Sequence, residues 1–220
     1  MADLRQALDA ARLYLVCGAV EDQLLHAALR GGAQIVQLRL KDAGDDAIVG
    51  AGRRMLAACR KHDALLIVND RPDLAVEIGA DGVHVGQDDL PVGRARAIIG
   101  PNRLLGLSTH TPAQVDAASA DPRVDYIGVG PVNATPTKPG RPAVGLKLVR
   151  HAAARARMPF FAIGGIDTGN AAAVVAAGAR RIAVVRAITE AKDPESAGRA
   201  LREALQDGAR AALRGGVGAA

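Results

Sequence analysis

The feature of this sequence that most constrains its fold is a regular alternation of short apolar runs and longer helical stretches. The short runs are rich in β-branched residues, as strands are, and each is followed by residues with the spacing of an amphipathic helix. Strands that are separated by helices must run parallel, with right-handed crossovers between them. Eight such units in 220 residues predict an α/β fold, a compact (β/α)8 or TIM barrel.

The expected strands are Leu13–Val16, Ile35–Leu38, Leu65–Val68, Gly82–Val85, Leu104–Leu107, Tyr126–Val129, Phe160–Ile163 and Ile182–Val185. The expected helices are Glu21–Arg30, Asp45–His62, Pro72–Ile78, Val92–Ile99, Pro112–Ala120, Leu146–Ala156, Asn170–Ala176 and Pro194–Ala211. No linker divides the chain, so we expect a single-domain barrel over residues 1–220, with residues 1–8 and 212–220 frayed. A doubly wound open sheet is the weaker alternative, because no glycine-rich dinucleotide turn follows the first strand.

Composition narrows the classes of function. Apolar residues make up 49% of the chain, enough for a core of Val, Ile, Leu and Ala, but aromatic residues make up only 2%, which disfavours nucleic-acid binding by base stacking. The formal net charge is +5, and arginines are scattered along the helical segments, as on a solvated surface. No run approaches the roughly 18 apolar residues of a membrane span, and the N-terminus has no signal-peptide pattern. The two cysteines, Cys17 and Cys59, have no metal-binding spacing and are typical of reduced thiols in a cytosolic protein. Together these features predict a cytoplasmic protein that binds neither nucleic acid nor a membrane.

Polar residues follow the expected strands, at the end of a (β/α)8 barrel where the chemistry collects. Three cations (Arg39, Lys41 and Lys138) and two separated carboxylates (Asp70 and Asp89) converge on one mouth. The carboxylates would repel an anionic substrate unless a divalent metal ion lay between them. Mg²⁺ is commonly held by one or two carboxylates plus substrate phosphates, so the set predicts Mg²⁺ and a substrate that bears a pyrophosphate.

Two other segments of the mouth have features of phosphate sites. The loop from Gly130 to Gly140 contains three prolines, which exclude regular structure, and its Thr135, Thr137 and Lys138 offer two hydroxyls and an ammonium. The Gly164-Gly165 turn and the end of the eighth strand occupy the usual phosphate site of such barrels. Two phosphate sites in one mouth imply two phosphorylated substrates, or one bisphosphate.

From Leu13 to Ile188 the chain resembles the thiamine phosphate synthase family. The most specific motifs are Gln37-Leu38-Arg39-Leu40-Lys41, Asn69-Asp70-Arg71, His84-Val85-Gly86-Gln87-Asp88-Asp89, Gly130-Pro131-Val132 and Thr135-Pro136-Thr137-Lys138. The resemblance implies a Mg²⁺-dependent transferase of thiamine biosynthesis. Such an enzyme joins 4-amino-2-methyl-5-(diphosphooxymethyl)pyrimidine to 4-methyl-5-(2-phosphooxyethyl)thiazole and releases pyrophosphate. The family is described as reacting dissociatively, through a pyrimidine cation and without a protein nucleophile.

The resemblance also implies roles for individual residues. The pyrimidine diphosphate would be bound by Gln37, Leu38, Arg39, Leu40, Lys41, Asn69, Ser108 and Lys138, of which Arg39, Lys41, Ser108 and Lys138 would act in catalysis. Asp70 and Asp89 would bind Mg²⁺, and the thiazole phosphate would be bound by Thr135, Pro136, Thr137, Gly165, Val185 and Arg186. The chain departs from the family at Arg186, where the family usually has serine.

Three other functions stay open at this point. A thiazole tautomerase of the same superfamily only moves a proton, and His110 would suit its acid–base step. Such an enzyme has no diphosphate to neutralise, so the metal carboxylates and the cations favour the synthase. A generic sugar-phosphate barrel enzyme is the second alternative. A non-enzymatic phosphate-binding barrel is the third, and it would not need the Asp70/Asp89 pair. The sequence leaves open whether the chain forms a homo-oligomer.

Overall fold

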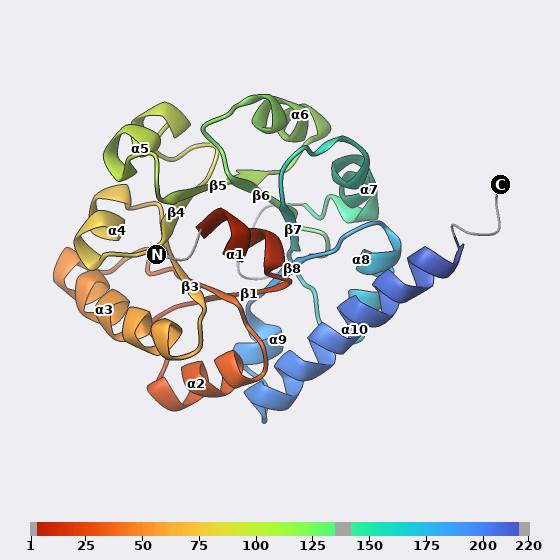
Figure 1. The fold of residues 1–220 in the computed structure, drawn as a ribbon, viewed down its shortest axis with the longest axis horizontal. Helices are drawn as coiled ribbons and strands as arrows, with labels where there is room; N and C mark the ends of the chain where they lie inside the picture. Colours follow the sequence, from red (N-terminus) through yellow and green to blue (C-terminus); the bar gives the residue numbers. More distant parts are fainter. Residues whose placement is uncertain (1–3, 135–141, 216–220) are drawn as a thin grey trace.

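The structure is a computed structural model that describes residues 4–134 and 142–215. Its strands run parallel and close into a barrel in sequence order, with β8 paired to β1 (Figure 1). They are β1 Leu13–Cys17, β2 Ile35–Leu38, β3 Leu65–Asn69, β4 Gly82–Val85, β5 Leu104–Thr109, β6 Tyr126–Val129, β7 Phe160–Ile163 and β8 Ile182–Val184. Each of these strands begins at the residue that the sequence predicted, and the (β/α)8 barrel is confirmed.

All described helices except the first surround the barrel as an outer ring, as Figure 1 shows from one end. In chain order, the described helices are α1 Leu4–Ala10, α2 Asp22–Arg30, α3 Asp45–Lys61, α4 Pro72–Ile78, α5 Val92–Ile99, α6 Pro112–Ala120, α7 Gly145–Arg155, α8 Ala171–Ala176, α9 Arg186–Thr189 and α10 Pro194–Gly215. Eight of these match the predicted helices to within a few residues, whereas α1 and α9 were not predicted. No helix within the described ranges is both long and apolar enough to cross a membrane.

The expectation that the two ends of the chain fray is wrong for the residues nearest the barrel. Residues 4–8 belong to α1, which lies across the end of the barrel that carries the N-termini of the strands (Figure 1). Leu4, Ala7 and Leu8 share one face of this helix and pack against the barrel interior, and Leu8 is only 2% exposed. At the other end, α10 continues to Gly215, so residues 212–215 are helical.

The strands divide the core into two layers because successive side chains point to opposite faces. In β1, Leu13, Leu15 and Cys17 face the helices, while Tyr14 and Val16 face the barrel interior. In β2, Leu38 faces the helices, and Gln37, two residues before Arg39, faces inward. The same alternation continues past the strand end and decides which residues of the Gln37–Lys41 segment reach the mouth.

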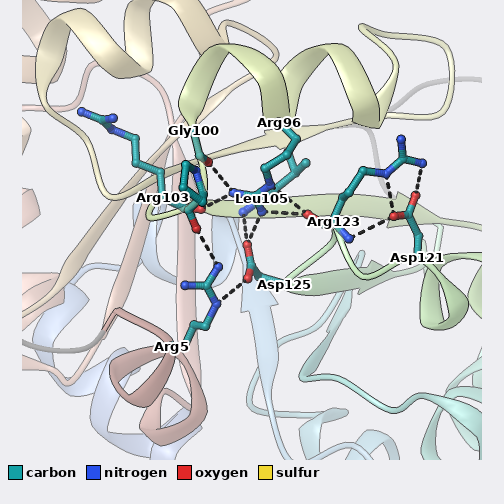
Figure 2. Close-up of polar contacts among 9 residues, drawn as sticks. Arg5, Arg96, Gly100, Arg103, Leu105, Asp121, Arg123 and Asp125 are labelled. Carbon is teal, nitrogen blue, oxygen red and sulfur yellow. Dashed lines mark hydrogen bonds and ion pairs between the residues drawn. The ribbon is translucent and has the colours of Figure 1, made fainter.

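A partly buried ion pair joins the N-terminal ends of β5 and β6 to α1 and α5 (Figure 2). The Asp125 carboxylate accepts hydrogen bonds from Arg96 at 2.6 Å, from Arg5 at 3.0 Å and from the Leu105 amide at 2.8 Å. Arg96 also donates to the carbonyl oxygens of Gly100, Arg103 and Arg123. This network fixes the end of the barrel opposite the mouth, the end that in TIM barrels contributes stability rather than chemistry.

Candidate active site

A cavity of about 460 Å³ opens at the C-terminal ends of the strands and is lined by residues from all eight of them. Most of the predicted site residues that the structure describes lie on its wall. These are Gln37, Arg39, Lys41, Asn69, Asp70, Asp89, Ser108, Gly165, Val185 and Arg186. The barrel therefore brings together residues from six predicted segments in one concave site, as its topology requires.

Two predicted residues do not line this cavity. The Leu38 side chain is 1% exposed within the layer between strands and helices, and Leu40 packs against the same layer. Successive side chains of this extended segment point to opposite faces, so Leu38 and Leu40 face the helices while Gln37, Arg39 and Lys41 face the cavity. Their side chains therefore do not face the cavity, and any contact of Leu38 or Leu40 with the pyrimidine diphosphate would come from the backbone, so this assignment stays a prediction.

The two predicted metal ligands meet at the mouth. Asp70 follows β3 with a left-handed backbone (φ 61°), which is unusual for a residue with a side chain. Asn69 Nδ2 donates to Asp70 Oδ2 at 2.5 Å, and the Gly86 amide donates to Asp89 Oδ2 at 2.8 Å. Burial of Asp70 and its contact with the Asp89 carboxyl raise the pKa of Asp70 to about 6, against the opposing effect of Lys41.

This donor set fits a divalent cation. Two carboxylates held close together repel each other, and a cation between them would relieve that repulsion. Among the residues that the structure describes, no group of three or more His, Cys, Asp or Glu side chains could hold a metal ion. A pair of carboxylates completed by substrate oxygens and water is nevertheless the usual way in which proteins bind Mg²⁺.

The floor of the cavity contains residues that the sequence analysis did not assign to the substrates. Tyr14, His84, Tyr126 and Phe161 line it, and the Phe161 ring packs edge-on against both tyrosine rings at centroid distances of 5.2 and 5.7 Å. Gly106 makes room for these rings, because a Cβ atom there would lie 2.2 Å from Tyr126 and 2.4 Å from His84. The sequence did contain a signal for these residues: they alternate with the outward-facing apolar residues of their strands and therefore point into the barrel. Polar and aromatic side chains are uncommon in such a position and indicate a functional role.

The Gly164-Gly165 turn forms the opposite wall. Its residues have φ angles of 107° and 57°, which favour glycine at both positions. The side-chain amides of Asn133 and Asn170 donate to the Gly165 carbonyl oxygen at 3.0 and 2.8 Å. These two bonds fix the orientation of the peptide groups at the turn.

Val185 and Arg186 follow β8 beside this turn, and both line the cavity. Arg186 begins the short helix α9, and its guanidinium lies 3.9 Å from the Glu190 carboxylate. The Arg186 side chain is 47% exposed, so it lies at the rim of the cavity rather than inside it.

Thr135, Pro136, Thr137 and Lys138 lie outside the described residues. The segment before them runs beside the glycine turn, because the Val132 amide donates to the Ile163 carbonyl at 2.8 Å and the Asn133 amide donates to the Gly164 carbonyl at 3.0 Å. His110, the candidate acid or base of a tautomerase, also lines the cavity, and its Nδ1 donates to the Gly130 carbonyl oxygen at 2.5 Å.

The comparisons with known proteins agree with this geometry. The sequence profile of a family described as thiamine monophosphate synthase matches residues 13–188. The thiamine-phosphate synthase of Mycobacterium sp. (strain KMS) is 51% identical over 217 residues, which cover 92% of this chain and 96% of that protein. The thiamine-phosphate synthase of Gloeobacter violaceus is 55% identical over 194 residues; these cover 87% of this chain but only 57% of that protein.

Solved structures lead to the same group of proteins. The thiamine phosphate pyrophosphorylase of Pyrococcus furiosus superimposes with a TM-score of 0.83 at 32% identity, covering 93% of this chain and 98% of that one. A 3-hexulose-6-phosphate synthase superimposes with a TM-score of 0.61 at 21% identity, a likeness that extends to the fold alone.

Proposed function

Because this chain belongs to the thiamine monophosphate synthase family, we propose that it forms thiamine phosphate and pyrophosphate from the pyrimidine diphosphate and the thiazole phosphate, with Mg²⁺ held by Asp70 and Asp89. The predicted family, the transferase class and the place in thiamine biosynthesis are confirmed by the relatives. The metal ion, the order of bond changes and the roles of single residues are proposals that rest on the cavity.

The observation that supports the proposal most directly is the charge arrangement of one cavity. Arg39 and Lys41 lie on the same wall as the Asp70/Asp89 pair, and a second anion-binding element, the Gly164-Gly165 turn, lies across from them. Cations and a carboxylate pair together suit a diphosphate that carries a divalent metal ion. The glycine turn suits a separate phosphate.

Mg²⁺, when bound, would neutralise charge that develops on the leaving pyrophosphate. Asp70 and Asp89 would hold it, and Asn69 would keep the Asp70 carboxylate turned toward Asp89. Arg39 and Lys41 would bind the diphosphate oxygens, together with Lys138 of the adjoining loop. Preorganised cations of this kind stabilise a transition state because they need not reorient as charge develops.

The bond changes need no protein nucleophile. The bond between the pyrimidine methylene carbon and the diphosphate oxygen breaks, and its electron pair leaves with pyrophosphate. The amino group of the ring stabilises the cation that remains, and the lone pair of the thiazole nitrogen then forms the new carbon–nitrogen bond. The buried aromatic floor of Tyr14, Tyr126 and Phe161 would exclude water, which would otherwise capture this cation.

The thiazole phosphate would bind the turn at Gly165 and the backbone at Val185 and Arg186. These backbone segments lie on the cavity wall close to one another, and Asn133 and Asn170 hold the turn in place. Thr135, Pro136 and Thr137 would complete this site from the adjoining loop. The Arg186 guanidinium at the rim would add a charge that the usual serine of the family lacks.

The tautomerase is the alternative that shares most of this cavity. His110 is placed to move a proton, but a proton transfer gives no reason for a pair of facing carboxylates beside Arg39 and Lys41. The expectations of a cytoplasmic location, of no contact with nucleic acid and of a possible homo-oligomer stay predictions.

Titration with pyrophosphate tests the metal assignment without turnover. Isothermal calorimetry of the wild-type protein should show binding with excess Mg²⁺ and a loss of at least about tenfold in affinity with EDTA, since a hydrogen-bonded charge is worth at least about 1.5 kcal/mol. Asp89→Ala should bind pyrophosphate equally weakly with and without Mg²⁺. The matched control, Glu203→Gln on α10, removes an exposed carboxylate far from the site and should behave as wild type. Binding that is independent of Mg²⁺ would contradict the assignment.

A further inference from the structure

Beneath the cavity, five polar side chains from five different strands form one continuous chain of hydrogen bonds. Gln37 Nε2 donates to the Tyr14 hydroxyl at 2.6 Å, and the Tyr14 and Tyr126 hydroxyl oxygens are 3.0 Å apart. The Tyr126 hydroxyl lies 3.2 Å from His84 Nδ1, and His84 Nε2 lies 3.0 Å from Ser108 Oγ. Every member is buried, and every member lines the cavity.

The direction of the chain follows from counting hydrogens. The Gln37 amide nitrogen can only donate, so the Tyr14 oxygen accepts there. The Tyr14 hydrogen then has the Tyr126 oxygen as its acceptor, and the Tyr126 hydrogen has His84 Nδ1. The opposite direction would leave the Tyr14 hydrogen buried without an acceptor in the chain, which costs more than a hydrogen bond contributes.

This direction fixes the protonation state of His84. A ring nitrogen that accepts from Tyr126 carries no proton, so the proton of the neutral imidazole lies on Nε2 and is donated to Ser108 Oγ. Burial raises the pKa of both tyrosines far above the usual value, so both phenols keep the hydrogens that the chain requires.

The two ends of the chain face the cavity with opposite hydrogen-bonding character. Ser108 Oγ already accepts from His84, so its own hydrogen is available to a ligand. Gln37 Nε2 is turned toward Tyr14, so the amide oxygen, for which no donor occurs among the described residues, is available as an acceptor. The cavity floor therefore offers an acceptor at one side and a donor at the other.

We propose that Tyr14, Tyr126 and His84 are positioning residues, which set Gln37 as an acceptor and Ser108 as a donor toward the ring of an aminopyrimidine. Such a ring carries an amino group that donates and ring nitrogens that accept, and so matches both ends of the chain. The identity of the ligand in this proposal rests on the proposed function. The direction of the hydrogen bonds does not depend on that function, because it follows from the contacts among the five side chains.

The first measurement is the tautomer of His84 in the protein without substrates. Long-range ¹H–¹⁵N correlation spectra of ¹⁵N-labelled protein distinguish the two neutral tautomers, and His84→Gln identifies the His84 signals among the five histidines. The expected result is a neutral ring with its proton on Nε2. A proton on Nδ1 would mean that the Gln37 amide is turned around and every bond is reversed, which would overturn the proposal.

The second measurement separates positioning from mere packing. Tyr126→Phe keeps the ring but removes the hydroxyl, and it should raise the KM for the pyrimidine diphosphate by about five- to tenfold, as the loss of one buried hydrogen bond does. The KM for the thiazole phosphate should stay unchanged. In a Ser108→Ala background, Tyr126→Phe should have a smaller effect, because the donor end of the chain is then already lost and only the Gln37 end still depends on Tyr126.

The outcomes are distinguishable. An equal effect of Tyr126→Phe with and without Ser108, or an equal rise in both KM values, would show that Tyr126 acts through packing and would overturn the proposal. A wild-type protein with the Nε2 tautomer but no synthase turnover would instead contradict the proposed function and leave the direction of the chain intact.

Discussion

Asp70 and Asp89 present their carboxyl groups to each other at the mouth of the barrel, and the backbone of Asp70 is left-handed at that point. Burial of Asp70, followed by the contact with Asp89, raises the pKa of Asp70 to about 6. In the folded protein without metal, ionisation of Asp70 therefore lowers the free energy of unfolding. A site that is unfavourable without its ligand is a common property of functional positions.

Replacing Asp70 should stabilise the protein that lacks metal. A carboxyl whose pKa is raised in the folded state favours folding below its unfolded pKa and loses that contribution as the pH rises through about 6. In EDTA at pH 8, Asp70→Asn should therefore melt higher than wild type, by roughly 2–4 °C for a gain near 1 kcal/mol after allowance for solvent screening. The difference should shrink at pH 5, where wild-type Asp70 is mostly protonated.

Differential scanning calorimetry at both pH values checks this prediction. Glu203→Gln removes a negative charge from the exposed face of α10 and should not reproduce the gain. Equal melting temperatures of Asp70→Asn and wild type at pH 8 would contradict the account of the carboxylate pair.

The network around Asp125 should carry a large part of the stability at the opposite end of the barrel (Figure 2). Arg96→Lys keeps the charge but cannot bind one carboxylate and three carbonyl oxygens at once. Because the Arg96 and Asp125 side chains are only 16% and 9% exposed, we expect Arg96→Lys to lower the free energy of unfolding, measured by urea denaturation, by about 2–3 kcal/mol.

The control for this prediction is an exposed pair of the same chemistry. Arg53 and Glu77 lie 3.4 Å apart with side chains that are 63% and 52% exposed, so Arg53→Lys should cost less than about 0.5 kcal/mol. Losses of similar size at the two positions would show that the Asp125 network is no stronger than a surface contact.

How far the sequence could predict the fold depended on whether an element belongs to the repeating strand–helix unit. The strands were predictable because short β-branched runs, each followed by a helical pattern, are strong local signals. Helices α1 and α9 were missed because they are additions to the strand–helix repeat, and segments of seven and four residues that form through tertiary packing show no helical period of their own. Leu8 of α1, for example, is helical because the barrel interior covers it.

The site was predictable for residues that follow strand ends, whereas residues inside strands were predicted only in part: Gln37 and Ser108 were assigned, but Tyr14 and Tyr126 were not. Arg39, Asp70 and Asp89 could be placed because all βα loops of a barrel converge on one mouth. Leu38 and Leu40 were assigned with their neighbours, although alternate residues of an extended segment face away from the cavity. The contacts of Tyr14, Tyr126 and His84 depend on the register of β1, β4 and β6 and on the space at Gly106, which no local pattern reveals.

Arg186 gives a prediction about the second substrate. Its guanidinium lies at the rim beside Glu190, close to the proposed site of the thiazole phosphate. Arg186→Ala should raise the KM for the thiazole phosphate, by about tenfold if one charged hydrogen bond is lost, and leave the KM for the pyrimidine diphosphate nearly unchanged. Arg186→Ser, which restores the usual residue of the family, should cost less. Initial-rate kinetics with each substrate varied in turn would show no change in either constant if only the Arg186 backbone matters.

The most direct test of the central claim is to supply both phosphorylated heterocycles with Mg²⁺ and to follow the product by mass spectrometry. The account predicts thiamine phosphate and an equal amount of pyrophosphate from the wild-type protein. It also predicts no product in EDTA, and none from Asp89→Ala even though that variant remains folded. Absence of thiamine phosphate with the wild-type protein, or full turnover in EDTA, would contradict it.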